Sequence, residues 1–109
     1  MGSKKYSVFW SKIAQDDLIE IIEYISLDSL DYAEQLFQNI KKHTVKLEDF
    51  PERGRIVPEL KFHDIDNYRE LIIRPRRLIF KIEERKVYIL AVFDGRRNFE
   101  DILLKRILR

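Results

Sequence analysis

The spacing of apolar residues changes twice along this chain, and no other feature constrains its fold as strongly. From residue 11 to residue 47 apolar side chains recur every three or four positions, which is typical of amphipathic helices. From residue 68 to residue 94 the pattern becomes that of strands, and from residue 99 to residue 109 the helical spacing returns. Helices followed by a run of strands predict an α+β fold, in which the helices cover one face of a sheet.

The first helical segment divides into two helices. Ser11 is placed to cap the first, and an interruption at residues 26–29 allows Asp28 or Ser29 to cap the second. The second helix ends before Pro51, because the residue before a proline disfavours helical dihedral angles. So short a connection predicts an antiparallel helical hairpin. We expect the first helix to turn four acidic residues toward solvent: Asp16, Asp17, Glu20 and Glu23.

Three consecutive strands are predicted at residues 68–74, 77–83 and 86–94, with short turns between them. Strands joined by such short turns form an antiparallel meander. In the third strand residues 87–93 are apolar on both faces, which is typical of a central strand that is covered on both sides. The meander is therefore the expected centre of the sheet, with the helical hairpin on one face.

The remaining segments complete a single domain over residues 1–109. Residues 5–10 are rich in aromatic and β-branched side chains and predict a first strand, which joins an edge of the sheet. Residues 51–67 are punctuated by proline and glycine and are interpreted as a loop that accommodates a short turn of helix. Residues 99–109 predict a last helix, which is basic on its exposed side.

Charge is divided unevenly along the chain. Residues 1–68 carry 9 basic and 13 acidic residues, a net charge of −4. Residues 69–109 carry 12 basic and 6 acidic residues, a net charge of +6, so the whole chain carries +2. Chance segregation of solvated charges produces such a division, but so does a basic surface that binds nucleic acid or an acidic protein segment.

The composition limits the kinds of site that the chain can build. It contains no cysteine, which excludes disulfides and thiolate chemistry and fits the cytoplasm. No apolar run approaches the roughly 18 residues of a membrane span. His43 lies on the polar side of its helix, and His63, although close to Asp64 and Asp66, has no second histidine nearby. We therefore expect no metal site and no cofactor.

Four motifs follow one another on this element pattern. Residues 50–59 resemble a P-x-x-G-R-x-x-P-E segment, and residues 68–71 read Y-R-E-L. Residues 77–82 resemble the strand motif Y-R-I-I-Y-R-I, and residues 87–97 resemble a strand that ends in V-x-H-x-x-R, with Asp94 in place of the histidine. In this order the motifs are similar to those of the RelE/ParE superfamily of bacterial and archaeal toxins, over nearly the whole chain.

The resemblance implies the toxin of a type II toxin-antitoxin module, a class that includes plasmid stabilization proteins. Such a toxin inhibits growth in the cytoplasm, and a cognate antitoxin protein binds and silences it. Its target is either messenger RNA on the ribosome, which it cuts as an endoribonuclease, or DNA gyrase, which it inhibits. An inactive member that only binds its antitoxin is a third alternative.

The nuclease alternative assigns catalytic roles to a few residues. The resemblance places Arg77, together with Arg96 or Arg97, at phosphate-binding positions, and the nuclease alternative uses Arg77 and Arg97. Asp94, in place of the histidine, is the candidate base. Ile102 stands near the position where ribosome-dependent nucleases carry a catalytic tyrosine. Structural roles are equally open, because Arg77 can pair with Glu70 across the sheet and Asp94 can cap the turn that follows it.

The gyrase alternative needs no catalytic residue and is slightly favoured, because the usual acid and base are missing. Both alternatives predict that Arg77 and its cationic neighbours gather on an accessible surface. The cations expected to bind a partner or nucleic acid are Arg69, Arg76, Lys81, Arg96, Lys105, Arg106 and Arg109.

Overall fold

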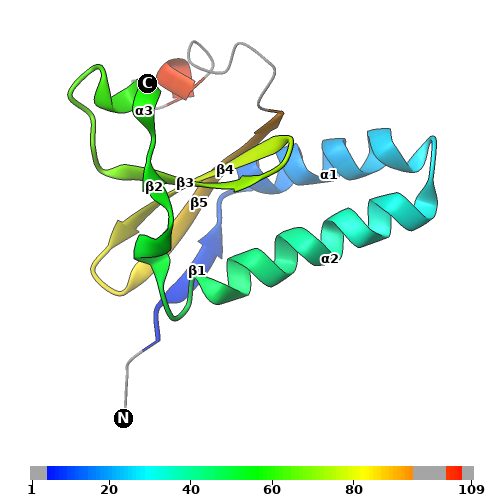
Figure 1. Ribbon diagram of the computed structural model, residues 1–109, viewed down its shortest axis with the longest axis horizontal. Coiled ribbons are helices and arrows are strands. Elements are labelled where there is room, and N and C mark those ends of the chain that lie inside the picture. The colour runs from blue at the N-terminus through cyan, green and yellow to red at the C-terminus, as the bar shows by residue number, and fades with distance from the viewer. Residues whose placement is uncertain (1–4, 95–102, 107–109) are drawn as a thin grey trace.

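The computed structural model describes residues 5–94 and 103–106 of the chain (Figure 1). It has the predicted α+β architecture, with two long helices packed on a mixed sheet of five strands. Residues 103–106 add a helical turn. The elements in chain order are β1 (Ser7–Trp10), α1 (Lys12–Ser26), α2 (Leu30–Lys46), a 3₁₀ turn (Pro51–Arg53), β2 (Arg55–Ile56), α3 (Pro58–Lys61), β3 (Tyr68–Ile73), β4 (Arg76–Glu83) and β5 (Lys86–Asp94).

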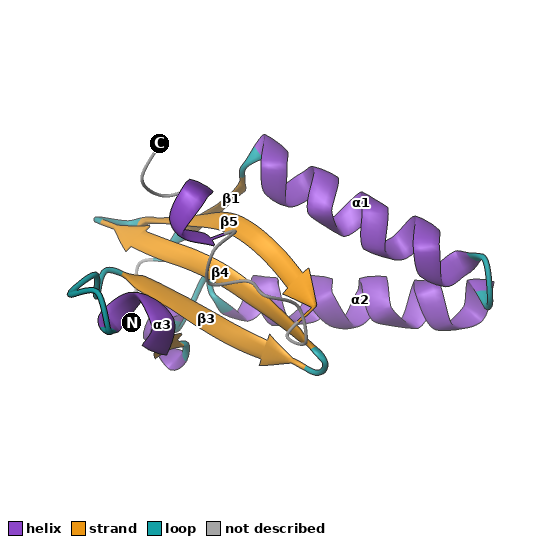
Figure 2. Cartoon of the chain, turned by 90° about the horizontal axis from the view of Figure 1, so that it is seen from above, coloured by secondary structure: helices purple, strands orange, loops and turns teal. Residues whose placement is uncertain are grey.

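The two helices begin where the sequence predicts. The hydroxyl of Ser11 accepts a hydrogen bond from the backbone N–H of Ala14 at 3.1 Å, and that of Ser29 accepts one from Tyr32 at 3.1 Å. These bonds satisfy amide groups that have no partner within the helix. Figures 1 and 2 show that α1 and α2 form a hairpin that projects beyond the sheet, with its turn at the far end.

The strands lie in the order β1-β5-β4-β3-β2, with β1 parallel to β5 and the other pairs antiparallel (Figure 2). The predicted meander and the edge position of the first strand are confirmed. The short turn of helix expected within residues 51–67 is present as α3, whereas the strand β2 in the same segment was not predicted. A two-residue strand is too short to produce an alternating pattern, and only its pairing with β3 defines it.

The core has two layers, one on each side of the sheet. Val87, Ile89 and Val92 of β5 pack toward the hairpin, whereas Ala91 and Phe93 pack toward the opposite face. A bulge in β5, where Ile89 and Ala91 pair with consecutive residues of β4, changes which positions face the hairpin. β5 is therefore covered on both faces, as its sequence predicts, but it lies between β1 and β4 and the central strand of the sheet is β4.

The face opposite the hairpin is covered by short segments. Val57 and Leu60 around α3, together with Leu103 of the last helical turn, are buried against β4 and β5. None of the helices in the described ranges is long and apolar enough to cross a membrane.

Candidate functional site

Arg77, the predicted catalytic arginine, is held by two carboxylates on the face opposite the hairpin. Its Nε donates to Oε1 of Glu70 at 2.6 Å, while Nη1 and Nη2 donate to the two oxygens of Glu59 at 3.0 and 2.9 Å. The side chain of Arg77 is 11% exposed and that of Glu70 is fully buried. A bidentate pair of this kind uses the donor geometry with which an arginine would bind phosphate.

Three elements bring this cluster together. Strand alternation turns Glu70 of β3 and Arg77 of β4 to the same face, and α3 supplies Glu59 one residue after the proline that begins it. Arg55 of β2 donates from Nε to Oε2 of Glu70 at 2.5 Å. The cluster thus contains two cations and two anions. Because both Arg55 and Arg77 contact Glu70, the negative charge of this buried carboxylate is compensated.

The pKa shifts within the cluster favour the ionised pair. The hydrogen bond from Arg77 lowers the pKa of Glu59, against a smaller opposing effect of burial. Burial by itself lowers the pKa of Arg77, but the hydrogen bonds to Glu59 and Glu70 outweigh it and raise that pKa. A phosphate that binds Arg77 must therefore displace two carboxylates that already stabilise its charge.

The other predicted catalytic residues do not join this cluster. Asp94 follows Phe93 on β5, so strand alternation turns it toward the hairpin face, away from Arg77. Its Cα pairs with that of Arg76 across the sheet. The predicted residues Arg96, Arg97, Ile102 and Arg109 lie outside the described residues.

Asp94 instead lines a small cavity at the end of β5, where α1 meets the last helical turn. There Asp17 accepts hydrogen bonds from the backbone N–H of Val92 at 3.0 Å and from Nη1 and Nη2 of Arg106 at 2.9 and 3.1 Å. The guanidinium of Arg106 also lies 4.8 Å from the ring centre of Phe93. Asp17 therefore bridges the edge of β5, beyond the end of β1, to the C-terminal segment.

The solvent-facing position expected for Asp17 is wrong. Its side chain is only 13% exposed, because it lies between α1 and the unpaired edge of β5. The spacing contains a signal that the prediction overlooked: Asp17 is one helical turn from both Ala14 and Ile21, which belong to the apolar face.

The remaining predicted cations are divided between the two faces of the sheet. Arg69 and Arg76 share the hairpin face with Leu71 and Leu78, whereas Lys81 shares the opposite face with Arg77. The accessible cluster expected around Arg77 is therefore not formed by these residues. Strand alternation already separates Arg76 from Arg77 and Lys81 in the sequence, and the prediction overlooked this signal. Only the pairing of β3 with β4 shows which of the two groups Arg69 joins.

Internal contacts also occupy several of these cations. Nη1 of Arg69 donates to the carbonyl of Gly54 at 2.7 Å, and Nζ of Lys81 lies 3.0 Å from a carboxylate oxygen of Glu83. Nε and Nη1 of Arg76 are buried and have no hydrogen-bond partner among residues 5–94 and 103–106. Lys105 is exposed on the last helical turn.

The two histidines contact residues of their own segments. Nδ1 of His43 lies 2.8 Å from the carbonyl of Asn39, one turn earlier in α2. His63 contacts the ring of Phe62 edge-on. No group of three or more potential metal ligands occurs among the described residues.

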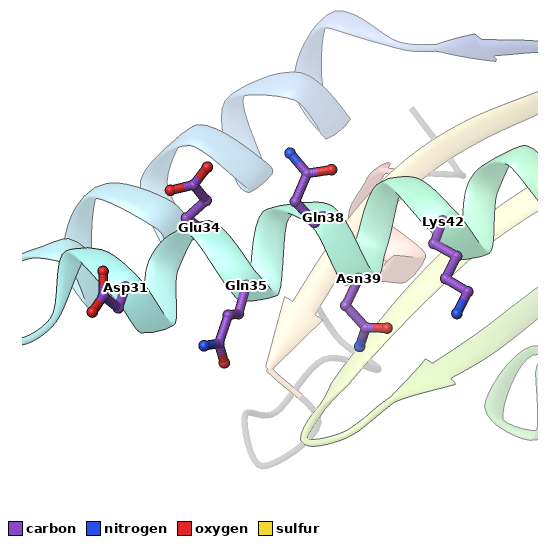
Figure 3. Close-up of a pocket in the computed structure, with 6 residues that line it drawn as sticks. All are labelled: Asp31, Glu34, Gln35, Gln38, Asn39 and Lys42. Carbon is purple, nitrogen blue, oxygen red and sulfur yellow. The ribbon is translucent and has the colours of Figure 1, made fainter.

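A shallow hollow runs along the exposed side of α2 (Figure 3). Its lining is polar and projects from successive turns of the helix: Asp31, Glu34, Gln35, Gln38, Asn39 and Lys42. It contains no pair of an acid and a base positioned for catalysis, so its chemistry is that of a hydrogen-bonding surface.

The family model described as the ParE toxin of the type II toxin-antitoxin system parDE matches residues 8–99. A chain of the chromosomal ParDE toxin-antitoxin system of P. aeruginosa is 22% identical, with 84% of this chain and 98% of that chain covered and a TM-score of 0.65. A chain of the toxin-antitoxin complex RelBE2 of Mycobacterium tuberculosis is 19% identical, with 85% and 94% covered and a TM-score of 0.55. No curated protein sequence matches the chain.

Proposed function

Because the chain belongs to the ParE toxin family of type II toxin-antitoxin systems, we propose that it inhibits growth by binding DNA gyrase and not by cutting messenger RNA. The observation that carries this proposal is the state of Arg77, which is 11% exposed and bound by Glu59 and Glu70. In the nuclease alternative that guanidinium would have to be free to stabilise the negative charge that develops on the phosphate during cleavage.

The placement of Asp94 supports the same proposal. A general base must lie within hydrogen-bonding reach of the proton that it removes, beside the group that stabilises the phosphate. Asp94 and Arg77 point to opposite faces of the sheet, so they do not act on one phosphate. Inhibition through a protein surface requires no such pair.

Expression in cells that lack the antitoxin tests the target. We expect growth arrest with a DNA-damage response, and we expect the purified protein to inhibit supercoiling by gyrase. Transcripts cut during translation, with gyrase unaffected, would identify the nuclease alternative. Normal growth would identify a member that only binds its antitoxin.

The variant Arg77→Lys distinguishes a nuclease from an inhibitor of gyrase. Lysine keeps a positive charge beside Glu70 but lacks the planar, bidentate geometry of a guanidinium. A nuclease that depends on Arg77 should lose nearly all of its toxicity, whereas an inhibitor of gyrase should remain toxic as long as the variant is folded. The exposed residue Arg74 provides the matched control, Arg74→Lys.

We also propose that a cognate antitoxin binds and silences this toxin in the cytoplasm. Both solved neighbours come from toxin-antitoxin systems, which supports such a partner. The basic second part of the chain favours an acidic, partly helical antitoxin segment, and a stable interface of this kind buries on the order of 1,500 Å². Co-purification with the product of the adjacent small reading frame, and recovery of growth when both are expressed, test this partner.

A further inference from the structure

The strand β1 forms one edge of the sheet and, within the described residues, pairs only with β5. The N–H groups of Ser7 and Ser11 donate to carbonyls of β5 and of the residue before it, at 2.9 and 3.0 Å. Because the C=O and N–H of one planar peptide unit point in opposite directions, the carbonyls of Tyr6 and Trp10 point away from β5. Alternation along the strand turns the N–H and C=O of Val8 outward as well.

Internal contacts already use two of the outward groups on this edge. The N–H of Tyr6 donates to the carbonyl of Glu48 at 2.8 Å, and Nε2 of Gln15 donates to the carbonyl of Trp10 at 3.1 Å. The other outward groups make no hydrogen bond within residues 5–94 and 103–106. They are the C=O of Tyr6, the N–H and C=O of Val8, and the N–H of Trp10.

The strand β1 has none of the features by which edge strands usually avoid pairing with another chain. Residues 7–10 contain no charged residue and no proline, and their register with β5 has no bulge. By contrast, β2 at the opposite edge has only two residues. On the part of β5 that extends beyond β1, Asp17 accepts a hydrogen bond from the N–H of Val92. The edge of β1 is therefore open to a further strand.

The free groups of this edge complement those of an identical edge in the antiparallel orientation. When Val8 lies opposite Val8 of a second copy, the N–H of each donates to the C=O of the other. Two residues along, the N–H of Trp10 meets the free carbonyl of Tyr6 of the second copy, and two-fold symmetry repeats this contact. The groups that meet in the remaining positions, the N–H of Tyr6 and the C=O of Trp10, already have internal partners.

The side chains of β1 fit the same register. Alternation turns Ser7 and Phe9 to the face opposite the hairpin, because Val8 between them packs toward it. Phe9 is 46% exposed on that face and stacks on Tyr88, with ring centres 5.7 Å apart. Both rings, together with Leu90, line a hollow beside the edge. In the pairing around Val8, Phe9 lies opposite Ser7 of the second copy, so the added strand covers the exposed ring and opposes no like charges.

We propose that this protein associates with a second copy of itself through antiparallel pairing of the two β1 strands, centred on Val8. The pairing joins two five-stranded sheets into one continuous sheet. A contact made by one short strand pair belongs to the small interfaces, below about 1,200 Å², so the dimer forms and dissociates with protein concentration. The inference concerns a surface that the proposed function does not use, and it does not depend on the target of the toxin.

The variant Val8→Pro tests the backbone pairing. Proline lacks the outward N–H, and an edge strand tolerates it where that N–H does not take part in the ladder, so the pairing with β5 is kept. Both hydrogen bonds between the two copies of residue 8 disappear. We expect the dissociation constant of the dimer, measured by analytical ultracentrifugation over a concentration series, to rise about tenfold or more. The control Val8→Thr keeps the N–H and the branched shape, and it should dimerise as the wild type does.

Disulfide cross-linking tests the register with little effect on the fold. The chain contains no cysteine, so Ser7→Cys and Phe9→Cys each introduce a single thiol. Residues opposite each other in a non-hydrogen-bonded antiparallel pair have Cα atoms about 4.5 Å apart, which a disulfide can bridge. A mixture of these two variants should therefore form a disulfide-linked dimer under mild oxidation. The control mixture combines Ser7→Cys with Asp66→Cys, an exposed position before β3, which β4 and β5 separate from β1, and it should remain largely uncoupled.

Each result supports the pairing or overturns it. A wild-type chain that stays monomeric over the concentration series overturns it and leaves the edge to a strand of another protein, such as an antitoxin. A dimer that persists in Val8→Pro, or cross-linking that is equal in the two mixtures, places self-association at another surface and also overturns it. If Val8→Pro does not fold, as judged by circular dichroism, the comparison of the two cysteine mixtures decides alone.

Discussion

Glu70 and Arg77 are diagonal neighbours across β3 and β4: Glu70 faces Ile79 in the register, Arg77 faces Ile72, and their side chains meet at 2.6 Å. The diagonal places a fully buried carboxylate against a nearly buried guanidinium. Such a pair is sensitive to the loss of one partner, because the other then remains charged in a region that excludes water.

Replacement of Arg77 by alanine is therefore expected to destabilise the fold. We expect a loss of about 3 kcal/mol in the free energy of unfolding, at the low end for buried pairs because Arg55 still contacts Glu70. Urea denaturation measures this loss. The exposed Arg74, changed to alanine, should cost less than about 0.5 kcal/mol. Equal stability of the two variants would contradict the structural role of Arg77.

The stability of the protein should depend on pH through Glu59. Because the hydrogen bond from Arg77 holds the pKa of Glu59 below its ordinary value of 4.5, the folded state binds a proton less readily than the unfolded chain. This contribution is present above pH 4.5 and is lost as the pH falls through the lowered pKa. The variant Glu59→Gln should show a smaller loss of stability than the wild type in urea titrations below pH 4.5.

A matched control for this prediction is Glu34→Gln, which removes an exposed carboxylate that makes no ion pair in the described part of the chain. Because this variant keeps the pair between Glu59 and Arg77, it should keep the loss of stability that this pair causes below pH 4.5. If the free energy of unfolding of Glu59→Gln fell as steeply as that of the wild type below pH 4.5, the pair with Arg77 would not contribute to stability in acid.

Gly54 is required because a side chain would not fit at this position, and not because of its backbone angles. Its φ of −76° is open to any residue, but a Cβ there would lie 2.7 Å from Cζ of Phe80 and 2.8 Å from the carbonyl oxygen of Glu70. We expect Gly54→Ala to destabilise the protein by about 1–3 kcal/mol through overpacking. Thermal unfolding, compared with that of the exposed neighbour variant Arg53→Ala, measures the effect, and identical midpoints would refute it.

Asp17 should protect the edge of β5 from hydrogen exchange and the C-terminal segment from proteolysis. The variant Asp17→Ala leaves the N–H of Val92 and the guanidinium of Arg106 without their carboxylate, at an expected cost of about 1.5–3 kcal/mol. Hydrogen exchange at Val92 should accelerate, and protease should cleave the C-terminal segment more readily. Asp16→Ala, one residue earlier, removes only an exposed pair with Lys12 and should leave both rates nearly unchanged.

The prediction of the fold succeeded where the controlling interactions are local. The caps Ser11 and Ser29 accept hydrogen bonds from amides three residues away. The strand β5 is apolar on both faces, so its own sequence predicts that both faces are buried. The prediction missed β2, whose two residues are a strand only because β3 lies beside them. It also placed Asp17 in solvent, since the edge that Asp17 covers belongs to a strand 75 residues later.

The sequence by itself determined the order of the long helices and strands, the helical hairpin, the meander and the family, because periodicity, capping and motifs are properties of neighbouring residues. Only the tertiary structure decided which charges are available to a partner. Arg77 meets Glu59 across 18 residues of chain, and Arg106 meets Asp17 across 89, whereas the exposed carboxylates Glu23 and Glu34 of the helical hairpin make no ion pair in the described ranges. Ion pairing depends on distance through space, which no local pattern of residues encodes.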